Sequence, residues 1–256
     1  MRFVFDLDGT IVFQGRPIAA IIQEALDDLL AQGHEVIFAS ARPIRDMLPV
    51  IPERYHSLPM IGGNGSFVMQ NRTNRFVATF PDEQLKAILL LMEQYQCTYL
   101  IDGEWDYAFT GVPDHPIRNN VDPLRLAKQV PIEALGTMVK ILILSSLDME
   151  ALYEQLTPFD IVIHRHGKEN VLDISPTGIH KWSSPQKLGV MPKGFVAFGN
   201  DANDIAMFQH AIHSVRIGGH EDLALHSTET VELSGEVEQV IAAKINELSR
   251  YYSNLE

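Results

Sequence analysis

The sequence predicts an α/β protein with a doubly wound, mostly parallel sheet and an inserted α+β unit. Short apolar strands alternate with amphipathic helices over residues 2–39 and again over residues 195–249. Between these stretches the pattern changes to a mixture of strands and helices that is typical of a separate α+β unit. Polar residues and glycines stand directly after strands of the outer stretches, where an open parallel sheet places its ligands.

The first strand–helix–strand unit lies at the start of the chain. Residues 2–5 predict a strand, and residues 18–32 carry apolar side chains at helical spacing, with Gly33 ending that helix. A second strand over residues 34–39 completes the unit, and this order predicts a right-handed parallel crossover. A short strand and a hairpin are expected next, at residues 59–61, 67–70 and 75–80.

The inserted unit is expected to begin near Pro81. Its predicted helices are residues 82–96, 123–128 and 148–156. Its predicted strands are residues 97–102, 106–111, 139–145, 161–165 and 171–174. The alternating pattern then resumes, with strands at 195–198 and 214–217 and helices at 204–211 and 236–249. We therefore expect a core of residues 1–80 and 178–256, interrupted by an α+β unit of residues 81–177.

Composition narrows the class of protein and of partner. The 256 residues are 46% hydrophobic and 21% charged, as in ordinary globular proteins. A net charge of −13 argues against a nucleic-acid or anionic-membrane surface, so a phosphate-bearing ligand needs a local metal or a few basic residues. The sequence has no secretion signal and no apolar run of about eighteen residues. The single cysteine, Cys97, fits a reducing compartment, and we expect a cytoplasmic protein.

The first predicted strand ends in two carboxylates, within the segment FDLDGT. Alternate side chains of an extended strand share a face, so Asp6 and Asp8 are expected to project the same way. An ordinary turn accounts for one aspartate but not for both. Two anions this close need a positive group nearby, and the candidates are a divalent cation, a lysine or a shared proton.

Polar residues follow other predicted core strands as well. They are Ser40 and Arg42 after the second strand, Asn64 after the third, and Asn200, Asp201 and Asp204 after a late strand. Because the carboxyl ends of parallel strands meet at one edge, we expect these residues to converge. An acid pair, a hydroxyl, an acidic loop and a nearby lysine suit phosphoryl transfer, which needs a nucleophile, a metal and neutralisation of the phosphoryl oxygens.

Five segments in this order, FDLDGT, FASARP, IGGNGS, DISPTGIHKW and FGNDANDIAMF, resemble the haloacid dehalogenase-like superfamily. More narrowly, they resemble its Cof-type, sugar-phosphatase-like members with a C2-type cap inserted after the second motif. The resemblance covers the whole chain. It implies a Rossmann-like core under a cap, and a Mg²⁺-dependent phosphoric monoester hydrolase. The expected partner is a small phosphorylated metabolite, such as a sugar phosphate; the oligomeric state stays open.

The same resemblance implies roles for individual residues. Asp6 attacks phosphorus and becomes an aspartyl phosphate, while Asp8 protonates the leaving oxygen and then activates water. Ser40 and Lys181 hold the phosphoryl oxygens. Thr10 supports the turn and Asp8.

Mg²⁺ is expected on Asp6, on the backbone carbonyl of Asp8 and on the late acidic loop. The family usually reads Gly-Asp-x-x-Asn-Asp there, whereas this chain has Asn200 at the first aspartate position and Asp201 after it. An amide oxygen can ligate Mg²⁺ but carries no charge, so affinity falls unless Asp201 takes over. Asn200, Asp201 and Asp204 therefore all stay candidate ligands.

Several residues have a second interpretation. Arg42 contacts the substrate or the cap, or Arg42 and Pro43 simply begin a helix. Asn64 hydrogen-bonds the leaving group, or occupies a position with positive φ. Asn203 positions the acidic loop or caps the helix after it. Lys140 begins an apolar strand and is expected to be solvated.

Two other functions stay open at this point. A phosphomutase or phosphotransferase uses the same aspartyl phosphate but passes the phosphoryl group to a sugar hydroxyl in place of water. A catalytically weak ligand-binding or regulatory protein is the other alternative, because Asn200 departs from the family pattern. Release of free phosphate distinguishes the hydrolase from the mutase, and Mg²⁺-dependent turnover of an aryl phosphate excludes the regulatory protein.

Overall fold

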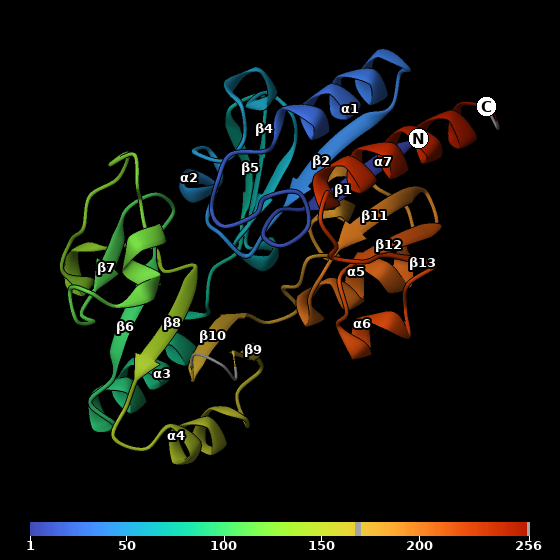
Figure 1. Cartoon of the computed structure of the whole chain (residues 1–256). Helices are drawn as coiled ribbons and strands as arrows, with labels where there is room; N and C mark the ends of the chain where they lie inside the picture. Colours follow the sequence, from blue (N-terminus) through green and yellow to red (C-terminus); the bar gives the residue numbers. More distant parts are fainter. Residues whose placement is uncertain (167–169, 255–256) are drawn as a thin grey trace.

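The computed structural model describes residues 1–166 and 170–254, which form two sheets lying side by side (Figure 1). The large sheet has eight strands in the order β13-β12-β11-β1-β2-β3-β4-β5. Its strands are β1 (Arg2–Asp6), β2 (Glu35–Ala39), β3 (Met60–Gly62), β4 (Phe67–Gln70), β5 (Thr73–Val77), β11 (Phe195–Gly199), β12 (His213–Ile217) and β13 (Glu229–Val231). Its helices are α1 (Ala20–Ala31), α2 (Ile44–Met47), α5 (Ile205–His210), α6 (Glu221–Ala224) and α7 (Val237–Ser253).

Strand order explains where a ligand site can form on the large sheet. The strands from β13 to β3 pair in parallel, and β4 and β5 add an antiparallel hairpin. From the central strand β1 the chain moves outward to β2 and β3, whereas β11, β12 and β13 build the other side. The direction of winding therefore reverses between β1 and β11, and open α/β sheets bind ligands at such a switch point.

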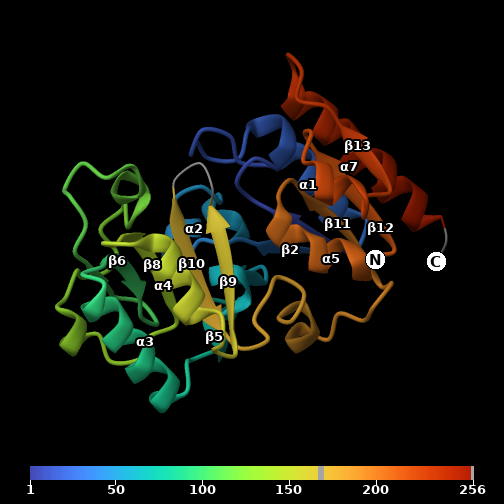
Figure 2. The same cartoon turned by 90° about the horizontal axis from the view of Figure 1, so that it is seen from below.

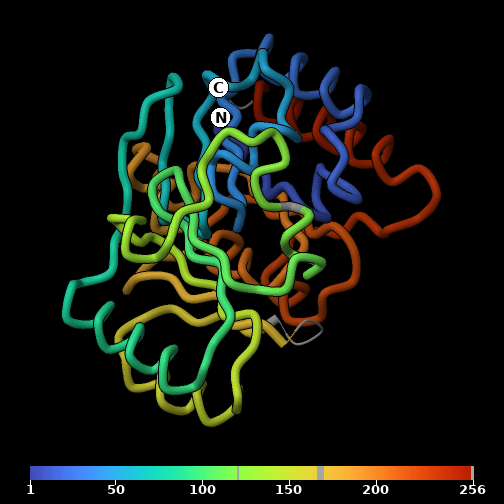
Figure 3. The backbone as a smooth tube through the Cα atoms, turned by 90° about the vertical axis from the view of Figure 1, so that its left-hand side faces the viewer, coloured from blue at the N-terminus to red at the C-terminus, as the bar shows by residue number. Residues whose placement is uncertain are grey.

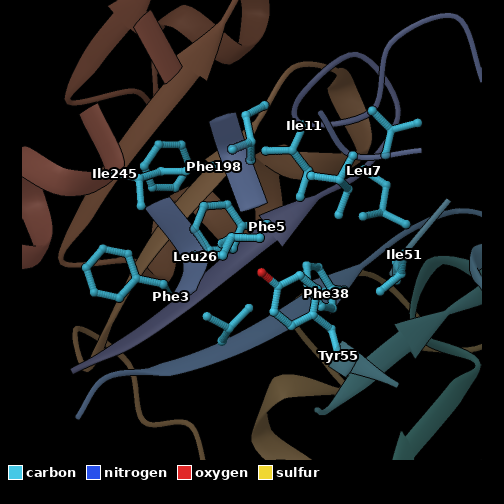
Figure 4. Close-up of a cluster of buried hydrophobic side chains, with 14 of the residues drawn as sticks. Phe3, Phe5, Leu7, Ile11, Leu26, Phe38, Ile51, Tyr55, Phe198 and Ile245 are labelled. Carbon is cyan, nitrogen blue, oxygen red and sulfur yellow. The ribbon is translucent and has the colours of Figure 1, made fainter. Parts of the chain in front are cut away.

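The large sheet is buried on both faces, which is why its strands read as continuous apolar runs. Phe3 and Phe5 point into a cluster with Leu26 of α1 and Ile245 of α7 (Figure 4). Val4, between them in sequence, points the other way and packs with Phe208. Helices α1 and α7 therefore cover one face of the sheet, and α5 covers the other.

The small sheet has five strands in the order β7-β6-β8-β10-β9, all paired antiparallel. Its elements are α3 (Asp82–Gln94), β6 (Thr98–Asp102), β7 (Tyr107–Phe109), β8 (Lys140–Ser145), α4 (Met149–Leu156), β9 (Ile161–His166) and β10 (Val171–Pro176). Figure 2 shows this sheet beside the large one, and in Figure 3 the green connection between β7 and β8 lies in front.

Period-two alternation gives the small sheet two different faces. Ile141 and Ile143 of β8 and Leu172 and Ile174 of β10 pack against α3 and α4. The alternate positions, which include Lys140 of β8, point to the opposite face, toward the large sheet. Polar side chains on that face can therefore reach the edge at which the parallel strands end.

The predicted elements are recovered with shifts of a few residues, except for one. Residues 123–128 were expected to be helical but form turns and bends. Asp122 and Arg125 have φ values of 48° and 54°, which a right-handed helix does not tolerate. The Asp122 carboxylate also accepts hydrogen bonds from the amides of Leu126 and Ala127, so it caps a loop. Short elements such as α2, α6 and β13 were not predicted, because four or fewer residues carry too little periodicity.

No helix of the described residues is long and apolar enough to cross a lipid bilayer.

A buried arginine joins the two sheets. Arg45 of α2 is 1% exposed and lies 2.5 Å from Asp102 of β6 and 3.2 Å from Asp46. It also donates to the carbonyl of Trp105 and lies 4.8 Å from the ring centre of Tyr107. Burial raises the pKa of Asp46 to about 6 even though Arg45 lowers it. The guanidinium is therefore the counter-charge that keeps two buried carboxylates between the sheets.

Replacing Arg45 by methionine should lower the free energy of unfolding by about 3–5 kcal/mol, because two buried carboxylates lose their counter-ion. Urea unfolding followed by circular dichroism measures this change. Arg54→Met is the matched control, since Arg54 pairs with Asp27 and stacks on Tyr55 in the same way but at an exposed site. The control should hardly move the urea midpoint, and equal shifts for both variants would contradict the argument from burial.

Candidate active site

Asp6, the last residue of β1, is the centre of the site. It is 3% exposed, and its Oδ1 lies 2.6 Å from Nζ of Lys181, which follows β10 in the chain. Its Oδ2 accepts a hydrogen bond of 2.8 Å from the Thr10 hydroxyl. Both carboxylate oxygens are therefore held in fixed directions by groups from two distant parts of the sequence.

Lys181 also contacts the loop that follows β11. Its Nζ lies 2.7 Å from Oδ1 of Asp204 and 3.1 Å from Oδ1 of Asn203. The second oxygen of Asp204 accepts the backbone amides of Asn200 and Asp201, at 2.9 and 3.2 Å. Asp204 thus fixes both the ammonium and the shape of the loop.

Two glycines allow these loops to approach. A Cβ on Gly199 would lie 2.6 Å from the Asp204 carboxylate, and a Cβ on Gly9 would lie 2.2 Å from Nδ2 of Asn200. Gly9 also has a φ of 78°, which favours glycine. Gly9 thus lets the loop after β1 approach Asn200, and Gly199 lets Asp204 fold back onto the end of its own strand.

The charges of the buried cluster do not balance. Burial raises the pKa of Asp6 to about 7, against the opposing effect of Lys181. Burial also disfavours the Lys181 ammonium, but Asp204 and Asp6 outweigh this, and its pKa lies above the usual value. One ammonium thus faces two carboxylates. A further positive charge beside Asp6 would relieve the excess.

Asp8 faces a different partner from Asp6, because β1 ends at Asp6 and the chain has turned. Both carboxylate oxygens of Asp8 accept from Arg42, at 2.7 Å from Nε and 2.6 Å from Nη2. The Asp8 side chain is 45% exposed, unlike that of Asp6. Arg42 in turn donates to the carbonyl of Asp46. The two aspartates therefore combine a buried carboxylate with an accessible one.

Ser40 and Asn64 lie at the same edge of the sheet. The Ser40 hydroxyl is buried and accepts the backbone amide of Arg42 at 3.1 Å. Asn64 has a φ of 56°, which confirms the interpretation as a position with positive φ, and its side chain makes two polar contacts within the protein. Its Oδ1 accepts from Asn203, and its Nδ2 donates to Asp173 of β10 at 3.1 Å.

The candidate metal ligands separate into two groups. Oδ1 of Asn200 lies 3.3 Å from the Thr10 hydroxyl that also contacts Asp6, so these oxygens gather at one place. The Asp201 carboxylate instead accepts the amide of Ala202 and lies 3.3 Å from Nε2 of His220, with its side chain 53% exposed. Residues 1–166 and 170–254 contain no group of three His, Cys, Asp or Glu side chains arranged to hold a metal.

The residues present nevertheless fit a magnesium ion. The buried cluster carries an excess negative charge, and Asp6 and Asn200 supply oxygen atoms, the donors that Mg²⁺ prefers. Mg²⁺ usually keeps several waters and needs only one or two carboxylates from the protein. Among the candidate ligands, Asp6 and Asn200 are those whose side-chain oxygens both lie beside the Thr10 hydroxyl.

A cavity of about 290 Å³ lies beside Asp8, between the two sheets. Asp8 and Arg42 line it from the large sheet, and Lys140, Leu142 and Asp173 line it from the small sheet. Lys140 was expected to be solvated, and this is wrong: it is 3% exposed and lies 2.9 Å from Asp173. The sequence signal for this pair was one lysine and one aspartate, each in an otherwise apolar strand.

A parallel sheet with a buried carboxylate at its switch point and an inserted unit over a small cavity is typical of an α/β enzyme with a cap. The profile of the haloacid dehalogenase-like hydrolases matches residues 3–236. The chain belongs to this family, as its motifs predict.

A curated relative is similar over most of the chain, and two solved structures share its fold. The chain is 23% identical over 249 residues to the 5-amino-6-(5-phospho-D-ribitylamino)uracil phosphatase of Bacillus subtilis, covering 90% of this chain and 92% of that protein. A haloacid dehalogenase subclass IIB sugar phosphatase superposes with a TM-score of 0.77 at 18% identity, covering 96% of this chain and 98% of the other. A haloacid dehalogenase-like hydrolase from Bacteroides thetaiotaomicron gives a TM-score of 0.79 at 18% identity, with the same coverage.

These likenesses confirm the predicted fold class. The protein has a Rossmann-like, parallel-dominated α/β core with an inserted α+β cap.

Asp6→Asn should stabilise the protein in the absence of divalent cations. The folded-state pKa of Asp6 is about 7, so between about pH 4 and pH 7 the native protein holds a proton that the unfolded chain has released. Wild-type stability therefore falls as pH rises across this range and levels off above it. The D6N variant lacks this loss, so its stability advantage over the wild type should grow by about 2 kcal/mol between pH 5.5 and pH 8.

Thermal and urea unfolding in EDTA between pH 5.5 and 8 measures the difference. Asp8→Asn is the control, because its carboxylate is half exposed and paired with Arg42. The difference in free energy of unfolding between the D8N variant and the wild type should stay constant across this pH range. A D6N curve parallel to the wild type across this range would contradict the argument.

Proposed function

We propose that this chain is a Mg²⁺-dependent phosphatase that hydrolyses small phosphate monoesters, such as sugar phosphates, through an aspartyl-phosphate intermediate. The observation that carries the proposal is the Asp6 carboxylate, fixed by Lys181 and Thr10 at the switch point beside a cavity that also contains Asp8. The activity printed for the Bacillus subtilis relative, a phosphatase of a phosphoribityl compound, supports the same class of substrate.

Asp6 is the nucleophile in this proposal. One carboxylate oxygen attacks phosphorus, and the bond to the leaving-group oxygen breaks. The Thr10 and Lys181 contacts leave the carboxylate no freedom to rotate, which supports attack along one direction. Lys181 and the Ser40 hydroxyl face the phosphoryl oxygens, where negative charge must be stabilised in the transition state.

Asp8 is the general acid and base. It gives a proton to the departing alkoxide, and then takes a proton from the water that attacks the aspartyl phosphate, so that inorganic phosphate leaves and Asp6 is regenerated. Arg42 positions Asp8 through two hydrogen bonds. Asn64 donates a hydrogen bond to Asp173 of the cap. The half-exposed Asp8 carboxylate is accessible to both substrate and water, as these two proton transfers require.

Asp6 and Asn200, with the backbone carbonyl of Asp8, would hold Mg²⁺. When bound, the ion supplies positive charge that lowers the pKa of Asp6 and neutralises the phosphoryl oxygens. Asp204 acts by accepting hydrogen bonds from Lys181 and from the backbone of the loop after β11. Asp201 accepts the amide of Ala202 and is not assigned to the ion.

We assign residues 1–80 and 178–256 to the catalytic core and residues 81–177 to the cap. The strands of the large and small sheets fall within these ranges, which supports the division. The single cysteine and the acidic charge support a cytoplasmic enzyme.

A screen of phosphorylated metabolites and p-nitrophenyl phosphate, with and without Mg²⁺, tests the proposal. We expect Mg²⁺-dependent release of inorganic phosphate from neutral sugar or alditol phosphates. Isomerised phosphosugar without phosphate release, or no turnover of any ester, would reject it.

Variants of the two aspartates should separate the two half-reactions. Asp6→Ala should lower kcat by more than about 1000-fold, since no acceptor for the phosphoryl group remains. Asp8→Asn should release up to one equivalent of p-nitrophenol from the aryl phosphate and then stall, because a good leaving group needs no proton but the second step needs a base. Rapid-mixing absorbance measures this burst. A D6A variant with the same burst would exclude Asp6 as nucleophile.

Asn200→Asp should lower the Mg²⁺ concentration for half-maximal activity by about 10-fold, because a second carboxylate joins the site. Asp201→Asn is the matched control and should leave that concentration nearly unchanged, since the Asp201 side chain faces Ala202 and His220. Activity measured against Mg²⁺ concentration gives both values. A higher requirement in D201N, with none of the expected gain in N200D, would assign the ligand to Asp201.

A further inference from the structure

The cavity between the sheets is next to the general acid, so in the proposed reaction it must hold the leaving group. Its volume of about 290 Å³ lies at the low end for ligand sites, which suits a single ring or a short chain. Leu100, Leu142 and Val171 give it aliphatic walls on the cap side. The polar groups on that side include Lys140 and Asp173, which lie on the neighbouring strands β8 and β10.

Lys140 and Asp173 are a buried pair that joins the cap to the catalytic edge. Their charged groups lie 2.9 Å apart, and the side chains are 4% and 2% exposed. The Lys140 ammonium also donates to the carbonyl of Ala41, directly after Ser40, at 2.8 Å. Asp173 accepts from Asn64. A desolvated ion pair contributes little net stability over an apolar replacement, and both members of this pair line the cavity.

The charges around the cavity limit what the leaving group can be. Arg42 and Lys140 are the cationic side chains among the described residues that line it. Arg42 faces Asp8 and Lys140 faces Asp173, so each already has a carboxylate partner. Asp46 and Asp102 add further negative charge to the lining, balanced by the buried Arg45. A second phosphate or a carboxylate on the leaving group would meet no uncompensated positive charge there.

We propose that Lys140 and Asp173 are specificity-determining residues that bind hydroxyl groups of the leaving group. The substrate is then a phosphate monoester of a neutral, polyhydroxylated alcohol, such as a sugar or an alditol. An ammonium donor beside a carboxylate acceptor matches a hydroxyl, or a pair of adjacent hydroxyls, which both donate and accept. This inference rests on the proposed phosphatase function and assigns the residues that select its leaving group.

The same pair is linked to the nucleophile. Asp173 contacts Asn64, Asn64 contacts Asn203, Asn203 contacts Lys181, and Lys181 holds Asp6. A substrate hydroxyl at Asp173 therefore lies at one end of a continuous set of polar contacts that reaches the site of attack.

The test compares two kinds of substrate for the wild type and three variants. Lys140→Met, Asp173→Asn and the double variant are assayed on a panel of neutral sugar and alditol monophosphates and on p-nitrophenyl phosphate, whose leaving group has no further hydroxyl. The double variant keeps the test valid if a lone buried charge prevents folding of a single variant. Lys86→Met is the matched control, because Lys86 is exposed on α3 of the same cap.

We expect each variant of the pair to lower kcat/KM for the best neutral substrate by about 10- to 100-fold, the effect of losing one hydrogen bond to a charged group. For p-nitrophenyl phosphate the change should stay within about threefold, since that ester does not use the pair. The wild type should also prefer neutral sugar phosphates to 3-phosphoglycerate and fructose 1,6-bisphosphate. Equal losses on both kinds of substrate, no loss, or a preference for an anionic leaving group would overturn the inference.

Binding separates this inference from the proposed function. If the wild type hydrolyses no ester in the panel, the phosphatase proposal fails. Calorimetric titration of D6N and of D6N/K140M with the same sugar phosphates and with p-nitrophenyl phosphate then measures how much the pair contributes to binding, in the absence of turnover. Selectively weaker binding of the sugar phosphates by D6N/K140M supports the pair as a hydroxyl site, and equal binding by both proteins rejects it.

Discussion

Lys181 stands between two buried carboxylates, and the geometry of the catalytic edge depends on this ammonium. It contacts Asp6 at the end of β1, Asp204 in the loop after β11, and Asn203 beside it. Without a charge at this position, two carboxylates would share a buried space with no counter-ion, and one of them would have to take up a proton. The lysine comes from neither strand, so folding of the segment after the cap is coupled to assembly of the site.

Motifs and strand periodicity predict where residues lie along the sheet better than where their side chains point. Asp6 and Asp204 lie close together as expected, because parallel strands end at one edge, and Lys181, expected from its motif, contacts both. Asp8 was expected to point with Asp6, but alternation ceases to apply once a strand ends, and Asp8 faces Arg42. Asn200 and Asp201 are adjacent in sequence but point differently, because the Asp201 carboxylate caps the turn at Ala202 whereas Asn200 lies beside Thr10.

Errors within the cap have the same origin. Residues 123–128 have a helical composition, but left-handed backbone at Asp122 and Arg125 prevents a helix, and local propensity does not report those angles. Lys140 was expected in solvent because an isolated lysine in a strand usually points there. Its burial depends on the ion pair with Asp173, which lies 33 residues later in the sequence, on the neighbouring strand β10. Contacts of that range are visible only once the strand order is known.

Within the part of the chain that the structure describes, the backbone passes between the two sheets twice, between Val77 and Asp82 and after Pro176. The intervening segment has its own hydrophobic cluster, built from α3, α4 and one face of the small sheet. Its sequence can therefore diverge, by substitution or by insertion in the connection between β7 and β8, while the residues around Lys181 stay unchanged. An evolutionary lineage built on this arrangement can acquire new specificities by changing one segment and inherit its chemistry intact.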